Sequence, residues 1–170
     1  MLDGMDGTTM ANASVTNILS QIATVEREII NPVSGSAIYA YDEIPYTIST
    51  ADMPLFVNFP GQLLSNEKLA TNRKYVVYKE TRNFKLSLFI GSYGQGVEGE
   101  KFEELNPYFD LVYNKFGSYP HLKNMGGIQS SKLIADTGDG TLEFIGSMWF
   151  GSAFTLQVVS KVLRLLGDNE

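Results

Sequence analysis

Three glycines, Gly94, Gly96 and Gly99, repeat the G-x-G-x-x-G spacing of dinucleotide-binding proteins, between a predicted strand and a predicted helix. In those proteins the glycines let the backbone approach a pyrophosphate at the helix N-terminus. Here the β-α-β alternation is missing on the N-terminal side. The acid expected about 20 residues later has no strand end to occupy, because the chain only leaves the helix at Gly117. The pattern favours a flexible loop without a dinucleotide, and a nucleotide-binding enzyme that uses residues 94–99 is a lower-ranked alternative.

A second motif, Asp136-Thr137-Gly138, matches the tripeptide of aspartic proteases. Retroviral-type proteases supply one such tripeptide per subunit of a dimer, so a single copy is compatible with that chemistry. Asp139-Gly140 follows immediately, however, and this dipeptide is typical of a hairpin turn. The sequence therefore predicts a turn here rather than a catalytic aspartate.

Two further groups of residues could do chemistry. The carboxylates of Glu98, Glu100, Glu103 and Glu104 could bind a hard cation, but acids are also favoured in the first turn of a helix by its macrodipole. We expect these acids to lie at the start of a helix rather than in a cation site. The single histidine, His121, would have to be the centre of any Ser-His-Asp triad, and it lies in a turn-like segment without a recognisable nucleophile beside it. We therefore predict no catalytic, cofactor or metal site, and a protein that is not an enzyme.

The composition bounds the class of protein. The chain has 170 residues, of which 44% are hydrophobic and 12% aromatic, enough for one domain with a core. Only 19% are charged, below the roughly 25% of soluble domains, which favours a subunit covered by neighbours. A net charge of −6 argues against binding phosphates, and the lack of cysteine excludes disulfides and thiolate zinc sites. No signal peptide or long apolar run is recognisable, so we expect a soluble cytoplasmic product.

Apolar residues that recur at helical spacing predict two amphipathic helices, one over residues 13–30 and one over about residues 100–116. Pro107 lies inside the second, so this helix either starts there behind an Asn106 cap or is kinked. Residues 159–166 also keep helical spacing and allow a short closing helix.

Runs of β-branched and aromatic residues predict the strands. The second run stops at Pro60-Gly61, a turn pair, and the polar residues 61–74 after it are expected to be irregular. Residues 75–90 form either one long bent strand or a hairpin that turns around residues 80–83. The predicted runs are 37–41, 55–59, 75–90, 128–135 and 142–159, the last broken by Gly146 and Gly151, with a turn at 136–140.

The order of elements, α-β-β-β-α-β-β, predicts an α+β fold: a mostly antiparallel or mixed sheet with two helices packed on one face, plus an extended β excursion. The excursion falls within residues 58–80. It is too long for a simple connection, so we expect it to contact another subunit or a partner. We assign residues 1–11 to an N-terminal arm, ordered by a neighbouring subunit, and residues 12–167 to a single domain.

The closing half of the chain is similar to that of a known family. A helix ends at residues 117–120 (G-S-Y-P), a strand follows at 128–134 (I-Q-S-S-K-L-I), and the turn leads into a return run at 144–158 (F-I-G-S-M-W-F-G-S-A-F-T-L-Q-V). This order resembles the tail terminator, or tail completion, proteins of long-tailed bacteriophages. The resemblance extends over about residues 13–160 as element order and spacing, without an invariant motif. The chain departs from it by a longer N-terminal tail and by the glycine-rich residues 91–99.

The resemblance implies a structural role. Proteins of this family assemble as a hexameric ring on the completed tail tube, stop its polymerisation and present a surface to head-closure or connector proteins. The expected partners are further copies of this chain, the tail tube protein, a head-closure or connector protein and the tape measure protein. DNA passes through such a ring without specific binding, which suits an acidic subunit. The expected location is the tail–neck junction of the virion, with assembly in the bacterial cytoplasm, no cofactor and no membrane.

Two alternatives stay open besides the nucleotide-binding enzyme: another neck component, such as a head-closure protein, and a non-viral α+β ligand-binding module. The resemblance does not place the contact surfaces of this chain. We expect large apolar and aromatic side chains to form the oligomer or partner interface. The candidates are Leu63, Leu64, Tyr75, Tyr78, Tyr93 and Trp149.

Overall fold

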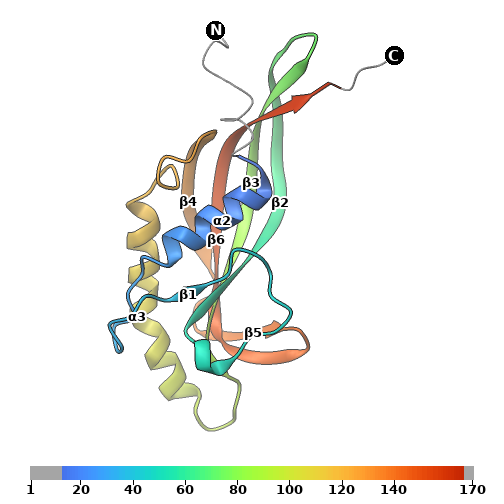
Figure 1. The fold of residues 1–170 in the computed structure, drawn as a ribbon. Helices are drawn as coiled ribbons and strands as arrows, with labels where there is room; N and C mark the ends of the chain where they lie inside the picture. Colours follow the sequence, from blue (N-terminus) through green and yellow to red (C-terminus); the bar gives the residue numbers. More distant parts are fainter. Residues whose placement is uncertain (1–12, 167–170) are drawn as a thin grey trace.

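The computed structural model describes residues 13–166, which form a long twisted sheet with helices beside it (Figure 1). The strand order in this part of the chain is β1-β2-β3-β6-β4, and β5 pairs with β6. β1 runs parallel to β2 and the other pairings are antiparallel, so the sheet is mixed. The fold is therefore α+β, as predicted.

The N-terminal arm of residues 1–11 lies outside the described residues. In chain order the elements are α2 (Val15–Glu26), β1 (Tyr39–Ala40), η1 (Thr50–Asp52), β2 (Leu55–Thr71), β3 (Tyr75–Ser92), α3 (Glu98–Gly117), β4 (Ile128–Asp136), β5 (Gly140–Phe144) and β6 (Ser147–Leu165).

The two helices differ in how well local periodicity places their ends. The side chain of Ser14 caps α2 by accepting a backbone N–H at 3.2 Å. α2 ends at Glu26, short of the predicted end at residue 30, because the chain turns back and Ile30 pairs with Ala37 in an isolated bridge. α3 covers the predicted residues 100–116 and runs continuously through Pro107, so a helix that starts at Pro107 behind an Asn106 cap is wrong.

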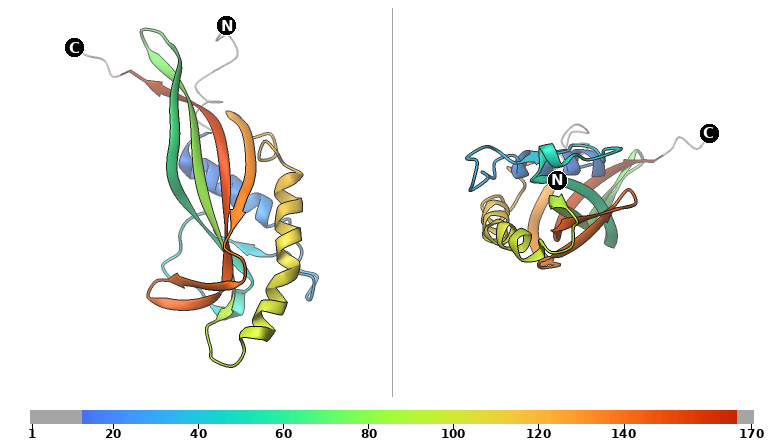
Figure 2. Two further views of the ribbon diagram at one scale, coloured as in Figure 1. Left: turned by 180° about the vertical axis from the view of Figure 1, so that it is seen from behind. Right: turned by 90° about the horizontal axis from the view of Figure 1, so that it is seen from below.

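Both helices pack on the same face of the sheet, as predicted from their apolar stripes (Figure 2). Phe84, Leu86 and Leu88 alternate along β3 and all point to this face. The same cluster includes Ile18 and Ile22 from α2, Leu105, Val112 and Phe116 from α3, and Phe154 and Leu156 from β6.

The opposite face carries a smaller apolar cluster that involves β5 and the segment before η1. Phe89 belongs to this cluster although its neighbour Leu88 belongs to the other, because successive side chains of a strand point to opposite faces. The buried members are Ile48, Leu55, Val57, Phe89 and Phe144.

β2 does not stop at Pro60-Gly61, so the prediction of an irregular segment over residues 61–74 is wrong. The register between β2 and β3 shifts directly after Pro60, which places the proline at a β-bulge rather than at a strand end. Gly61 then lets the strand pass close to β3, since an added Cβ would lie 2.5 Å from the carbonyl oxygen of Asn83. The two turn residues therefore bend the strand instead of ending it.

The predicted closing helix is also wrong, because β6 continues as a strand to Leu165. Residues 159–165 pair in continuous register with residues 75–81 of β3. β3 is one strand throughout, which excludes a hairpin around residues 80–83. The hydrogen-bonding edge of β3 overrides a local pattern that fits a helix equally well.

Of the two glycines expected to interrupt the last run, only Gly146 does so. It lies in the β5–β6 turn with a φ of 72°, a conformation that favours glycine. Gly151 lies within β6, where an added Cβ would overlap the carbonyl oxygen of Leu88. It permits close strand approach rather than a break.

Candidate assembly surface

The β2–β3 hairpin and the end of β6 project from the body as three paired strands (Figures 1 and 2). We call this projection the β finger and define it as residues 61–83 and 160–165. It is the extension that the sequence predicts within residues 58–80, built from paired β-strands. Its expected role in subunit contact remains a prediction.

The tip of the β finger is a tight turn whose shape is set by Asn72. Its Oδ1 atom accepts hydrogen bonds from the backbone N–H groups of Lys74, at 2.8 Å, and of Tyr75, at 2.9 Å. The backbone N–H of Asn72 also donates to the carbonyl oxygen of Tyr75 at 2.9 Å. An asparagine that binds its own turn in this way restricts the backbone. Arg73 and Lys74 are thus held at the end of the molecule with exposed side chains.

Side-chain contacts also join the strands of the β finger. Arg164 of β6 pairs with the carboxylate of Glu80 on β3 and lies over the ring of Tyr78, 5.3 Å from its centroid. Arg82 of β3 donates to the carbonyl oxygen of Gly61 on β2 at 3.0 Å. These contacts stiffen the projection.

The outer edge of β2 is open along most of its length. Its described pairing with β1 covers only Leu55 and Phe56. The edge is irregular, because the register shifts after Pro60, after Leu63 and after Lys68. Bulges, proline and lysine on an open edge oppose the addition of another strand. The β finger is therefore better suited to contact through side chains than through strand pairing.

The six predicted interface residues fall into two groups. The first, Leu63, Leu64, Tyr75 and Tyr78, lies on the β finger, where Leu64 is 46% exposed and the other three are half-buried. The second, Tyr93 and Trp149, lies at the other end of β3 and β6, but the two rings pack on opposite faces of the sheet: Tyr93 packs against Phe150 of the larger cluster, with centroids 5.3 Å apart. The Trp149 ring packs edge-on against Phe89, with centroids 6.5 Å apart.

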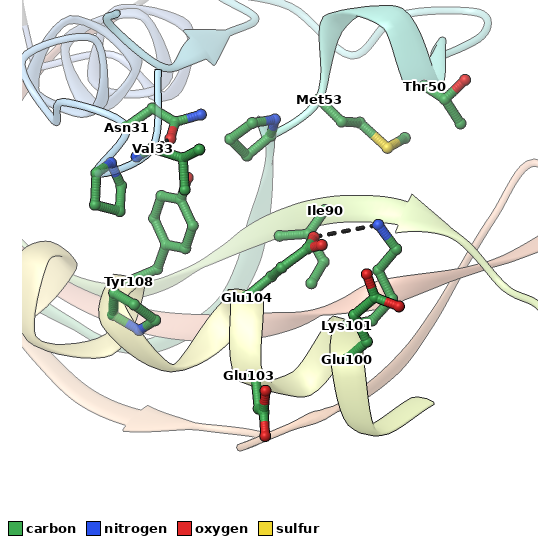
Figure 3. Close-up of a pocket in the computed structure, with 13 residues that line it drawn as sticks. Asn31, Val33, Thr50, Met53, Ile90, Glu100, Lys101, Glu103, Glu104 and Tyr108 are labelled. Atoms are coloured by element: carbon green, nitrogen blue, oxygen red, sulfur yellow. Dashed lines mark hydrogen bonds and ion pairs between the residues drawn. The ribbon is translucent and has the colours of Figure 1, made fainter. Parts of the chain in front are cut away.

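A cleft of about 690 Å³ lies between the first half of α3 and the segment of residues 31–54 (Figure 3). Glu100, Lys101 and Glu104 line it from α3, and the Lys101 Nζ lies 3.2 Å from the Glu104 carboxylate. Met53 and Thr50 form the opposite wall. The sequence alone does not predict this cleft, because its walls come from segments far apart in the chain.

The glycine motif lies beside this cleft and is partly inside α3. The backbone N–H of Gly96 donates to the carboxylate of Glu98 at 2.8 Å, so a loop amide that an anion would need is already occupied. Gly99 belongs to the first turn of the helix. The strands that flank β3 run antiparallel to it, unlike the parallel strands of a dinucleotide-binding unit. The acids Glu98 and Glu100 occupy the first helical turn, as predicted.

Asp136 forms hydrogen bonds within a turn, and His121 lies in a loop. Asp136 accepts hydrogen bonds from the backbone N–H of Gly138 at 2.8 Å and from the Tyr113 hydroxyl at 2.9 Å. Burial and this carboxylate raise the pKa of Tyr113. The predicted turn is therefore present, with Gly138 at a φ of 68°. His121 is exposed in the loop after α3, where a loop residue was predicted.

Within residues 13–166, no group of three His, Asp or Glu side chains is arranged to hold a metal ion. None of the helices in this range is long and apolar enough to cross a membrane. The sequence matches no protein-family model and no curated protein.

Proposed function

We propose that this chain is the subunit of a ring that caps the tail tube of a long-tailed bacteriophage, ends its polymerisation and joins it to the neck. The β finger carries the proposal. A closed ring needs one patch of each subunit to meet a different patch of the next subunit. A stiff projection on one end of the body, with Leu64 exposed on its surface, supplies one such patch. The order of elements, which resembles that of tail terminator proteins, supports the same role.

The proposed ring has two working faces and a central channel. One face contacts the tail tube protein, and the tape measure protein is expected on the same side. The other face contacts a head-closure or connector protein. DNA passes through the channel without specific binding, consistent with a net charge of −6 on each subunit.

Light scattering on the purified protein, alone and with the tail tube protein, together with negative-stain images, tests the ring directly. Six-membered rings are the expected result. Inactivating the gene should give tail tubes of irregular and excessive length beside unattached heads. Tails of normal length beside heads that leak DNA would instead support the head-closure alternative. A monomer that binds nucleotide would support the enzyme.

A further inference from the structure

The charges of this chain are strongly separated. The β finger holds seven of the 13 Lys and Arg residues and two of the 19 Asp and Glu residues, which gives it a net charge of +5. The whole chain has a net charge of −6, so the remainder carries −11. The basic residues of the β finger are Lys68, Arg73, Lys74, Lys79, Arg82, Lys161 and Arg164.

Most of the positive charge on the β finger is not neutralised within the described chain. Arg164 is the one basic side chain of the β finger that forms an ion pair with a described residue. Lys79 of β3 lies directly opposite Lys161 of β6. Like charges opposite each other destabilise a pair of strands. On its other side Lys79 lies opposite Glu67 of β2, so Lys161 is the member of this pair with no carboxylate opposite it among the described strands.

The cleft beside α3 has the complementary charge. Glu100, Glu103 and Glu104 line it against the single cation Lys101. The first-turn position explains Glu100 through the helix dipole, but Glu103 and Glu104 lie beyond that turn. The Lys101–Glu104 pair leaves the other two carboxylates of the lining without a described cation.

Tyr108 is a second, independent sign of a ligand in this cleft. Its side chain rises from α3 into the hollow toward Asn31 and Val33 (Figure 3). The residue as a whole is only 4% exposed, and its hydroxyl opens to the cleft, where it makes no hydrogen bond with any described residue. A tyrosine hydroxyl held at the wall of a cleft by a buried ring is ready to bind a polar group of a ligand. Burial and the Glu104 carboxylate raise the pKa of Tyr108 to about 12, so the hydroxyl stays protonated.

We propose that the tip of the β finger of one copy docks in the acidic cleft of the next copy. Arg73 and Lys74 pair with Glu100, which has no described cation, and with Glu104, whose carboxylate they share with Lys101. A polar group of the tip binds the Tyr108 hydroxyl. This inference rests on the proposed ring and identifies the two patches that build it.

A second copy is the occupant that the geometry favours. The tip of the β finger and the start of α3, whose residues line the cleft, lie at opposite ends of the molecule (Figure 1). One chain therefore cannot bring its own finger into its own cleft. Contact between opposite ends is heterologous and runs head to tail, which closes a ring when the rotation between successive copies allows it and gives an open filament otherwise. The turn at Asn72 presents Arg73 and Lys74 in a fixed shape, so little ordering is needed on docking. Opposite charges on the two patches also set the register of the contact.

Cross-linking tests the contact without removing any charge. The chain has no cysteine, so Thr71→Cys beside the tip and Thr50→Cys on the cleft wall create the only thiols. A short bismaleimide is preferable to a disulfide, which requires Cα atoms within about 7 Å. The double variant should give a ladder of covalent oligomers that ends at the closed ring. The control pairs Thr71→Cys with Asn114→Cys, an exposed position on the other half of α3, and should stay monomeric.

The outcomes separate this contact from the ring itself. Rings in light scattering without cross-links above the control would overturn the docking but leave the proposed function intact. A ladder that never closes would support the docking and contradict the ring. Covalent dimers alone would show a reciprocal pair of copies and overturn the head-to-tail contact. If the double variant gives no ladder and light scattering shows no rings, both the docking contact and the proposed ring are refuted.

Charge reversal tests the side chains. Arg73→Glu with Lys74→Glu should lower the cross-linking yield at least tenfold, and Glu100→Lys with Glu104→Lys should do the same. All four changes in one chain should restore the ladder. Raising the salt from about 0.1 M to about 1 M, which shortens the Debye length from about 10 Å to about 3 Å, should weaken the native contact. An unchanged ladder in the Arg73/Lys74 variant, with loss of binding to double-stranded DNA, would show that the tip contacts phosphate instead.

Discussion

Replacing Glu26 by glutamine should remove a pH dependence from the stability of this protein. Glu26 ends α2 and is fully buried, and Asn58 of β2 is 4% exposed. The Asn58 Nδ2 donates to one carboxylate oxygen of Glu26 at 2.7 Å. Burial raises the pKa of Glu26 well above its usual 4.5, and this outweighs the lowering by Asn58 and by Arg27. Glu26 is thus a neutral acid in the folded protein at pH values where it is ionised in the unfolded chain.

The hydrogen bonding of the pair is consistent with a proton on Glu26. The Oε1 atom of Glu26 and the Oδ1 atom of Asn58 are both buried without a partner. Two acceptors that face no donor would leave Asn58 half satisfied, whereas a protonated carboxyl carries one O–H donor. A glutamine side chain at position 26 carries N–H donors in the same place and cannot ionise.

The sign follows from proton binding. Because the pKa of Glu26 is raised on folding, the folded state binds more proton than the unfolded state above pH 4.5. The contribution of Glu26 to the free energy of unfolding is complete below pH 4.5. It falls by up to about 1.4 kcal/mol per pH unit as the pH rises toward the pKa of the folded state. The free energy of unfolding of Glu26→Gln should lack this slope. Its value relative to the wild type should therefore increase as the pH rises.

Urea unfolding at fixed protein concentration, followed by the fluorescence of the single Trp149, measures the difference between the two proteins. Titrations common to both chains cancel in that difference. In a companion variant, Asn58→Ala, removing the donor should cost about 1–3 kcal/mol, since a buried oxygen of Glu26 loses its partner. A difference between wild type and Glu26→Gln that stays constant from about pH 4 to about pH 8 would refute the reasoning.

Three further substitutions have defined outcomes. Ile145→Asn should raise the thermal midpoint by about 2–4 °C, because Ile145 has a φ of 50° in the β5–β6 turn, is 59% exposed, and asparagine tolerates this conformation; an unchanged or lower midpoint would contradict this. Gly151→Ala should lower the free energy of unfolding by about 3 kcal/mol, since its Cβ would overlap the Leu88 carbonyl, whereas Gly140→Ala has open space and serves as the control in the same urea assay. Joining residues 68 and 78, which pair across the hairpin, through Asn-Gly should give a folded monomer by circular dichroism and light scattering; rings formed by this shortened chain would count against the β finger as a contact surface.

The local pattern of the sequence determines the elements whose partners do not compete with it. The stripe of Leu105, Val112 and Phe116 predicts α3, because 3.6-residue periodicity places these side chains on one face whatever packs there. Alternation of Phe84, Leu86 and Leu88 likewise predicts the buried half of β3. The α+β class follows from the order of these elements.

Parts of the assembly surface are visible in the sequence but not its arrangement. Lys68, Arg73, Lys74, Lys79 and Arg82 are clustered in the chain, and this charge pattern could have marked the β finger as basic. The pairing of Lys79 with Lys161, however, depends on the register between β3 and β6. The acidic cleft depends on the packing of residues 31–54 beside α3.

Tertiary structure alone decides the elements for which local signals are balanced or misleading. Residues 159–165 have spacing that fits a helix, yet they form a strand because residues 75–81 offer unpaired backbone groups. Pro-Gly is a dipeptide typical of turns, but here Pro60 lies at a bulge and the close approach of β3 requires Gly61. The burial of Glu26 against Asn58 has no local signal either. In each case the deciding free energy comes from hydrogen bonds and packing between residues distant in sequence, which a local pattern does not contain.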